Sequence, residues 1–190
     1  MSTLLLPCCY LAPASHYSSL WHAGAGDALI EVCDHYRRQT LRNRCMIDSP
    51  QGPLPLSIPV VKPMGHALTR DIRISDHGNW RHQHWNALMS SYGQSPFYEY
   101  YADDLAPFYE KKWDFLVDFN EALMQLMCQL MGIPPRISRT ESFGGDPFAQ
   151  QFHPMKEPYW QVFGHKQGFR PNLSIVDLLF NMGPEGLLLL

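Results

Sequence analysis

The sequence predicts an α/β (or α+β) fold, with a mixed sheet built from an N-terminal strand-rich half and a central helical region. Short apolar or alternating segments, separated by Gly and Pro, fill the first half of the chain, which is typical of strands. Apolar residues recur with a helical period farther along. Hydrophobic residues make up 45% of the 190 residues, which is enough for a packed core. We therefore expect one domain spanning residues 1–190.

The first half is predicted to contain mainly strands. We expect them at Thr3–Cys9, Ala28–Cys33, Arg38–Ile47, Pro53–Val60 and Arg70–Ile74. Prolines at 53, 55 and 59 remove backbone N–H groups along one side of the fourth segment, which predicts an edge strand. Between the first two strands, Ser15 is expected to cap a short helix that includes Trp21.

The second half is predicted to be mainly helical. We expect helices at 79–92, 98–111, 113–131 and about 175–182, an extended segment at 135–143 and a short strand at 159–163. Pro107 should break the second of these helices. The third has the clearest apolar stripe, which includes Phe119 and Leu123. Ser174 and Asp177 form a capping pattern at the start of the last helix, and capping explains Asp177 fully.

Three arginines fall on one face of the predicted strand Arg38–Ile47. Arg38, Arg42 and Arg44 occupy alternating positions, and alternating side chains of a strand share a face. Such a face can clamp a phosphate, pyrophosphate or carboxylate, because guanidinium groups bind these anions with paired hydrogen bonds. It can equally be a solvated face whose arginines pair with nearby acids. Asn43 lies on the opposite face and could read a ligand hydroxyl only if the strand end twists.

Two histidines are candidate proton carriers. His16 follows the first predicted strand, near Tyr10 and Ser15, and loops at strand ends are where α/β domains bind ligands. It can equally be a surface histidine. His84 lies among apolar residues of the helix at 79–92, so it is either a general acid or base or a hydrogen-bonded core residue. Cys8 and Cys9 are either nucleophiles or small buried residues.

Composition and missing motifs exclude several classes of function. The net charge of -3 disfavours nucleic acid as a partner. The 5 cysteines include no CxxC pair, so neither a disulfide framework nor a paired-cysteine zinc site is indicated, and a reducing, cytoplasmic location is expected. No segment approaches the roughly 20 apolar residues of a membrane span. P-loop, GxGxxG, GxSxG and HExxH motifs are missing, and the sequence does not identify a cofactor.

Several blocks together resemble one family. They are Tyr10-Leu11, Gln39 to Cys45, Trp80 to Trp85, Ser95 to Tyr101, and Gly168 to Pro184. These blocks identify the chain as similar to WbqC-like proteins, of the kind frequent in Bacteroidetes. The resemblance implies an enzyme of bacterial surface-polysaccharide and O-antigen metabolism that transfers an acyl or aminoacyl group to or from an activated or amino sugar.

One block departs from the family pattern. Many relatives begin with His-Gln-Pro-x-Tyr-Leu-Pro. Here Tyr10 and Leu11 match, but Leu6 stands at the leading His position and Ala12 at the later Pro position. If that His were catalytic in relatives, this protein would lack it, or His16 would have to substitute.

The sequence leaves different classes of function open. In the first, an enzyme holds the pyrophosphate of a small anionic ligand, a sugar nucleotide or acyl-CoA, with Arg38, Arg42 and Arg44, while His16 or His84 moves the proton. In the second, a non-catalytic module binds an anionic ligand or a protein partner through aromatic residues at 97–101 and 159–163. A third is a cysteine-dependent acyltransferase. The oligomeric state is not determined by the sequence.

Overall fold

A three-stranded parallel sheet organises one side of the molecule. The computed structural model describes residues 4–24, 28–134, 136–149, 155 and 157–190. The sheet contains β1 (Leu4–Pro7), β2 (Ala28–Glu31) and β5 (Ile137–Arg139), in the order β1-β2-β5, with β2 in the middle. Helix α1 (Ala14–Ala23) connects β1 to β2. Because the three strands are parallel, their carboxyl ends meet at one edge, where ligands commonly bind in α/β folds.

A separate hairpin holds part of the predicted arginine strand. Strands β3 (Arg44–Ile47) and β4 (Leu54–Ser57) pair antiparallel. The α/β class is confirmed, although parallel and antiparallel strands form two sheets and not one. The prediction of a strand from Arg38 was wrong, because the chain turns before Arg44: Gln39 has a φ of 57°, and the Asn43 N–H donates to the carbonyl of Thr40 at 3.2 Å.

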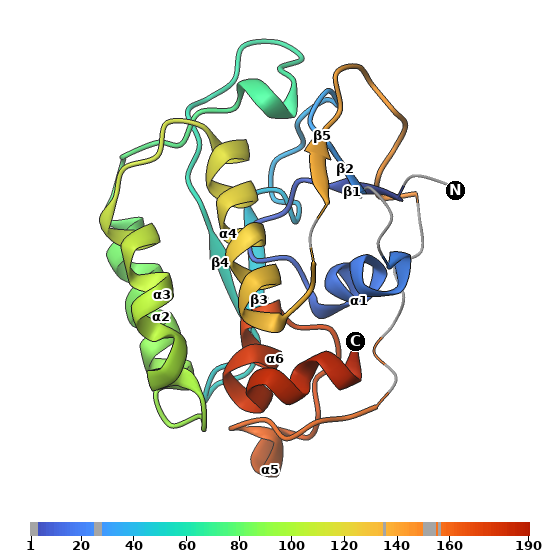
Figure 1. Ribbon diagram of the computed structural model, residues 1–190. Helices are drawn as coiled ribbons and strands as arrows, with labels where there is room; N and C mark the ends of the chain where they lie inside the picture. Colours follow the sequence, from blue (N-terminus) through green and yellow to red (C-terminus); the bar gives the residue numbers. More distant parts are fainter. Residues whose placement is uncertain (1–3, 25–27, 135, 150–154, 156) are drawn as a thin grey trace.

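The remaining elements follow in chain order. They are η1 (Thr69–Asp71), α2 (Trp80–Tyr92), α3 (Tyr98–Glu110), α4 (Leu116–Met131), α5 (Gly164–Gln167), α6 (Ile175–Met182) and η2 (Gly183–Leu189). Helices α2 and α3 lie side by side on the flank opposite the parallel sheet, and α4 runs between them and that sheet (Figure 1). The predictions for α2, α4 and α6 are confirmed to within a few residues at each end.

Two predicted strands and one predicted break are not found. Residues 70–74 form a 3₁₀ turn and isolated bridges, with Ile74 opposite Val60 and Arg73 opposite Phe115. Residues 159–163 form no strand. Pro107 lies inside α3 without ending it. Thr3 of the predicted first strand and Pro135 of the predicted extended segment 135–143 fall outside the described residues.

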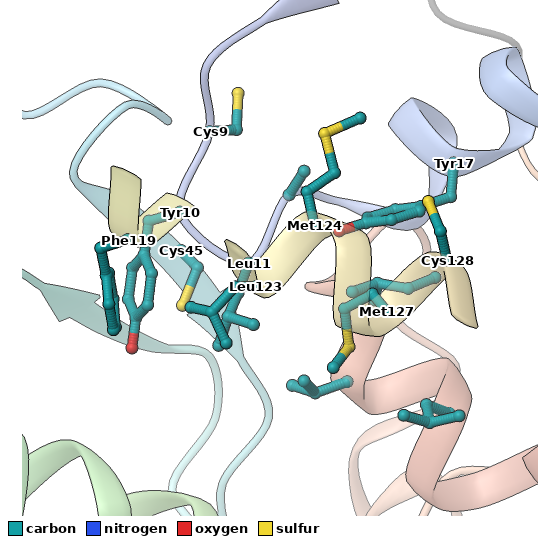
Figure 2. Packing of buried hydrophobic residues seen from close by; sticks show 14 of the residues in the cluster. Cys9, Tyr10, Leu11, Tyr17, Cys45, Phe119, Leu123, Met124, Met127 and Cys128 are labelled. Carbon is teal, nitrogen blue, oxygen red and sulfur yellow. The ribbon is translucent and has the colours of Figure 1, made fainter. Parts of the chain in front are cut away.

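The core is assembled around α4. Leu116, Phe119, Leu123 and Met127 are fully buried on one face of this helix, as its apolar period predicts. Figure 2 shows the Tyr10 ring beside that of Phe119, with the centroids 5.8 Å apart. Helix α4 is therefore the element against which the segment after β1, the hairpin and α6 are packed.

Two helix starts differ from their predicted caps. Ser15 lies inside α1, and its backbone N–H is capped by the Asn172 side-chain oxygen at 3.0 Å. Ser174 precedes α6, but its hydroxyl donates to the Leu11 carbonyl at 2.8 Å. Asp177 caps no backbone group and is instead buried among polar side chains. The first N–H of α6, that of Ile175, donates to the Ala12 carbonyl at 2.9 Å, so groups distant in sequence accept from the first turn of both helices.

Two glycines that end helices allow a test of packing at the C-terminus of α6. Gly24 after α1 and Gly183 after α6 have nearly the same backbone angles, with φ of 64° and 56°. A Cβ at Gly183 would lie 2.6 Å from the Phe97 ring, whereas one at Gly24 would meet nothing within 4 Å. Both alanine variants pay backbone strain of about 1–3 kcal/mol, and only Gly183→Ala adds an overpacking cost of about 1–3 kcal/mol.

We therefore expect Gly183→Ala to lower the free energy of unfolding more than Gly24→Ala in urea titrations followed by circular dichroism. Equal losses in the two variants would show that the Phe97 contact does not constrain this turn.

Candidate functional site

A cavity of about 510 Å³ lies beyond the carboxyl ends of β2 and β5. Segments 34–46 and 143–148 line it, so the loops after both strands and the start of β3 contribute. Figure 1 shows these loops at the top of the view. The volume falls within the roughly 300–1,000 Å³ common for small-molecule sites, and the position is where α/β domains bind ligands.

A buried carboxylate at the end of β2 holds the two loops together. Glu31 accepts hydrogen bonds from the Cys33 N–H at 2.7 Å, the Thr140 hydroxyl at 3.0 Å and the Gly144 N–H at 2.7 Å. Buried carboxylates need such donors to offset their lost hydration. Glu31 thereby fixes the loop that carries Phe143, an aromatic residue lining the cavity.

Arg42 is part of the cavity wall through a buried ion pair. Its guanidinium contacts the Asp34 carboxylate, and the two side chains are only 5% and 7% exposed. Asp34 also accepts the Thr69 hydroxyl, and the Arg42 guanidinium lies 4.5 Å from the centre of the Phe148 ring. Because Asp34 offsets the charge of Arg42, the main role of Arg42 is structural, although its side chain also borders the cavity.

Arg37 and Arg44 are the other cations lining the cavity. Arg44 is half-buried, and its Nε donates to the Ser57 hydroxyl at 2.9 Å; Arg37 is exposed. Within the described residues neither forms an ion pair with a carboxylate. Arg38 is exposed and does not line the cavity. The turn before β3 has thus brought Arg37, and not Arg38, beside Arg42 and Arg44.

The charge of the cavity wall is positive by one. Three arginines and two aspartates, Asp34 and Asp146, line it. Asp146 accepts the Phe148 N–H at 3.0 Å and so shapes its own loop. With Asp34 committed to Arg42, this arrangement favours an anionic ligand near Arg37 and Arg44.

Two predicted ligand-binding residues lie outside the cavity lining. Tyr10 is fully buried, and its hydroxyl lies 2.9 Å from His84 Nδ1 and 2.9 Å from the Tyr109 hydroxyl. Asn43 is buried as well, and its Nδ2 donates to the Ile58 carbonyl at 3.0 Å. Both side chains contribute to packing between elements.

The two predicted proton carriers are also core residues. Burial lowers the pKa of His16 to about 3 and that of His84 to about 4. Neither lines the cavity. His84 is the hydrogen-bonded core residue that the sequence allowed as one alternative, because its Nδ1 is hydrogen-bonded to the Tyr10 hydroxyl. The catalytic roles of both histidines stay predictions.

The cysteines are buried thiols. Burial raises the pKa of Cys8 to about 12 and raises that of Cys9 and Cys45 well above the usual range. Cys45 borders the cavity, but a protonated thiol is a weak nucleophile. The cysteine-dependent reaction therefore has no support from this geometry. Among the described residues, no group of three or more His, Cys, Asp or Glu is placed to hold a metal ion.

Sequence reasoning missed several residues of the wall. His35, Arg37, Phe143, Asp146 and Phe148 line the cavity. Ligands commonly bind beyond the carboxyl ends of parallel strands. This rule would have indicated residues 143–148 if the segment near residue 137 had been assigned to the same sheet as β2. Arg37 had no such signal, because it stood out of phase with the assumed strand.

Comparison with known proteins places the chain in a family. The family model described as "WbqC-like protein family" matches residues 25–150 and 137–188. The chain belongs to the WbqC-like protein family. It is also 29% identical over 192 aligned residues to the uncharacterized protein Rv1507c of Mycobacterium tuberculosis (strain ATCC 25618 / H37Rv), covering 79% of this chain and 81% of that protein. No solved structure matches the chain.

The family resemblance read from the sequence blocks is confirmed for this WbqC-like protein. The cavity lies within the matched residues, since 34–46 and 143–148 both fall inside them. A search for membrane spans finds no helix in the described part of the chain that is long and apolar enough to cross a bilayer.

The first prediction for this site concerns the buried ion pair. Arg42→Ala leaves the Asp34 carboxylate buried without its counter-ion, which should cost about 3–5 kcal/mol of unfolding free energy. Arg44→Ala is the matched control, because it removes a half-buried arginine whose bond goes to a serine. A double change of Arg42 to Met and Asp34 to Leu should recover most of the loss. Similar urea midpoints for R42A and R44A would contradict the structural role of Arg42.

The second prediction concerns acid stability. His16 is kept neutral in the folded state down to a pKa of about 3, whereas an unfolded histidine protonates near pH 6.5. The unfolded state therefore binds more protons between these values, and stability is lost as the pH falls through this window. His16→Gln should remove up to about 1.4 kcal/mol per pH unit from the slope of unfolding free energy.

The slope is to be measured by urea titration at several pH values between 4 and 6. Burial raises the pKa of Asp177, and this carboxyl contributes with the opposite sign in both proteins, so the difference between them isolates His16. Parallel slopes for wild type and variant would contradict the prediction.

Proposed function

We propose that this WbqC-like protein is an enzyme of bacterial surface-polysaccharide metabolism that transfers an acyl or aminoacyl group to or from an activated or amino sugar. The cavity beside β3 is the proposed binding site, and its ligand carries a pyrophosphate, as sugar nucleotides and acyl-CoA do. One observation carries the proposal: Arg37 and Arg44 border an open cavity without a carboxylate partner among the described residues.

The proposed anion contact is made by these two arginines. A guanidinium donates two parallel hydrogen bonds to a phosphate, and two guanidinium groups are held near each other most favourably when an anion lies between them. Arg44 is oriented by its bond to Ser57, so its charge is positioned before the ligand arrives. Such preorganisation reduces the entropy lost on binding.

An apolar wall supports a ligand with a flat ring as well as a charge. Phe143 is 62% exposed and Met46 is 37% exposed, and both line the cavity. Exposed aromatic rings stack on nucleobases and contribute about 1–3 kcal/mol per base in proteins that bind nucleic acid. A uridine or adenine ring against this wall, with its diphosphate at Arg37 and Arg44, would use both features of the cavity.

The alternative function is a non-catalytic module that binds the same anion or a protein. The predicted aromatic contact surface supports it only in part. Tyr100 is 81% exposed and Trp160 is 56% exposed, but their neighbours Tyr98, Tyr101 and Tyr159 are buried. Turnover of an acyl donor in the presence of a sugar acceptor would separate the enzyme from the module.

Binding of a diphosphate ligand is the direct test. We expect Arg44→Ala to weaken binding of UDP-glucose or acetyl-coenzyme A about 10-fold or more in titration calorimetry, since a charged hydrogen bond contributes about 1.5–3 kcal/mol. Arg38→Ala is the matched control, because Arg38 is an exposed arginine of the same turn that does not line the cavity.

Arg37→Ala should resemble R44A in this assay. Equal binding by R38A, R37A and R44A, or no binding of either probe by the wild-type protein, would remove the proposed ligand site.

A further inference from the structure

His35 occupies a fixed position on the cavity wall. It lines the cavity and is exposed. Its backbone forms an antiparallel bridge with Leu68. On one side of it the Thr69 N–H donates to the Asp34 carbonyl at 2.9 Å, and on the other the Tyr36 N–H donates to the Ala67 carbonyl at 3.0 Å. The paired segment therefore restrains the backbone of His35 from both sides.

One hydrogen bond determines which ring nitrogen carries the proton. His35 Nδ1 lies 3.2 Å from the His66 carbonyl oxygen. A carbonyl can only accept a hydrogen bond, so Nδ1 must be the protonated nitrogen. In the neutral ring Nε2 then carries the lone pair. The His66 ring packs edge-on against that of His35, with centroids 5.5 Å apart, which further limits rotation of the imidazole.

The other titratable groups facing this histidine are less suited to accept a proton. Asp34 uses one carboxylate oxygen for Arg42 and the other for Thr69. Asp146 accepts the Phe148 N–H, and a carboxylate is a weaker base at neutral pH than an imidazole. The Cys45 thiol is buried. The charged neighbours that remain are Arg37, Arg42 and Arg44, which carry protons already and accept none.

We propose that His35 is the general base of this cavity, with Nε2 as the proton-accepting atom. The inference rests on the proposed function. The hydroxyl or amine of a sugar acceptor attacks the acyl carbon of a thioester donor, and its proton passes to Nε2 as the new O–C or N–C bond forms. The C–S bond then breaks, the leaving thiolate takes the proton from Nε2, and neutral His35 is restored. Neither nitrogen of His16 or His84 is required in this step.

The tautomer of His35 can be measured directly. In ¹⁵N-histidine-labelled full-length protein at pH 8, we expect the His35 signals, identified by their loss in His35→Asn, to show the Nδ1–H neutral form. His66→Asn should keep that form, because the bond goes to the backbone carbonyl of residue 66. Observation of the Nε2–H form in wild type would overturn the proposal, since the lone pair would then be on the wrong nitrogen.

Addition of a ligand separates this inference from the proposed function. With saturating UDP-glucose or acetyl-coenzyme A, the Nε2 resonance should shift, and the shift should fall in R44A in proportion to lost binding.

The outcomes are distinguishable. Calorimetric binding without any change at Nε2 would overturn the role of His35 while leaving the ligand site intact. Failure of both probes to bind the wild-type protein would remove the proposed function and with it the reaction assigned to His35. Binding, the expected tautomer and a shifted Nε2 resonance together would support the assignment.

Discussion

The buried ion pair between Asp34 and Arg42 is the interaction on which the candidate site depends. It joins the segment after β2 to the turn before β3, and it is extended by the Thr69 hydroxyl and the Phe148 ring. Three parts of the chain, the segment that contains Asp34 and Arg42, Thr69 and Phe148, therefore meet at one pair of charges. Removing two charges from water is costly, and that cost is tolerated here because hydrogen bonds and a ring face surround both groups.

Buried carboxylates fasten irregular segments elsewhere in the molecule too. Glu31 holds the loop after β5 to the end of β2. Asp177, at the start of α6, accepts hydrogen bonds from the Tyr92 hydroxyl at 2.9 Å, the Tyr159 hydroxyl at 2.5 Å and the Gln161 amide at 2.8 Å. Burial raises the pKa of Asp177, and these three donors oppose that rise. Glu31 and Asp177 each thus connect an irregular segment to a strand or helix through one acidic side chain.

The same arrangement separates paired from unpaired cations in the cavity. Asp34 offsets the charge of Arg42, whereas Arg37 and Arg44 form no ion pair with a carboxylate among the described residues and are the anion contacts in the proposed function. Membership in the WbqC-like family agrees with the resemblance read from the sequence, and the reaction remains the proposal argued above. His35 adds an imidazole to a cavity whose other titratable side chains are three arginines, two aspartates and a buried cysteine.

The sequence by itself determined several of the regular elements, namely helices α2, α4 and α6 and strand β2. The apolar stripe through Phe119 and Leu123 predicted α4, and the apolar segment at 28–33 predicted β2. These signals are local, because a helix or strand must present one apolar face at its own period. They also predicted the α/β class, which depends on the order of such elements along the chain. The family resemblance came instead from blocks of specific residues, such as Gln39 to Cys45.

Only the tertiary structure decided which polar residues meet. The alternating arginines from Arg38 to Arg44 are compatible with a strand and also with a turn. The positive φ of Gln39 shows that the chain turns in this segment. The position of Asp177 matched a local helix cap, but its carboxylate accepts hydrogen bonds from residues 85 and 18 positions away in the sequence. The cavity joins segments about 100 residues apart. Contacts over such separations depend on how the core packs, and a pattern within one segment contains no information about them.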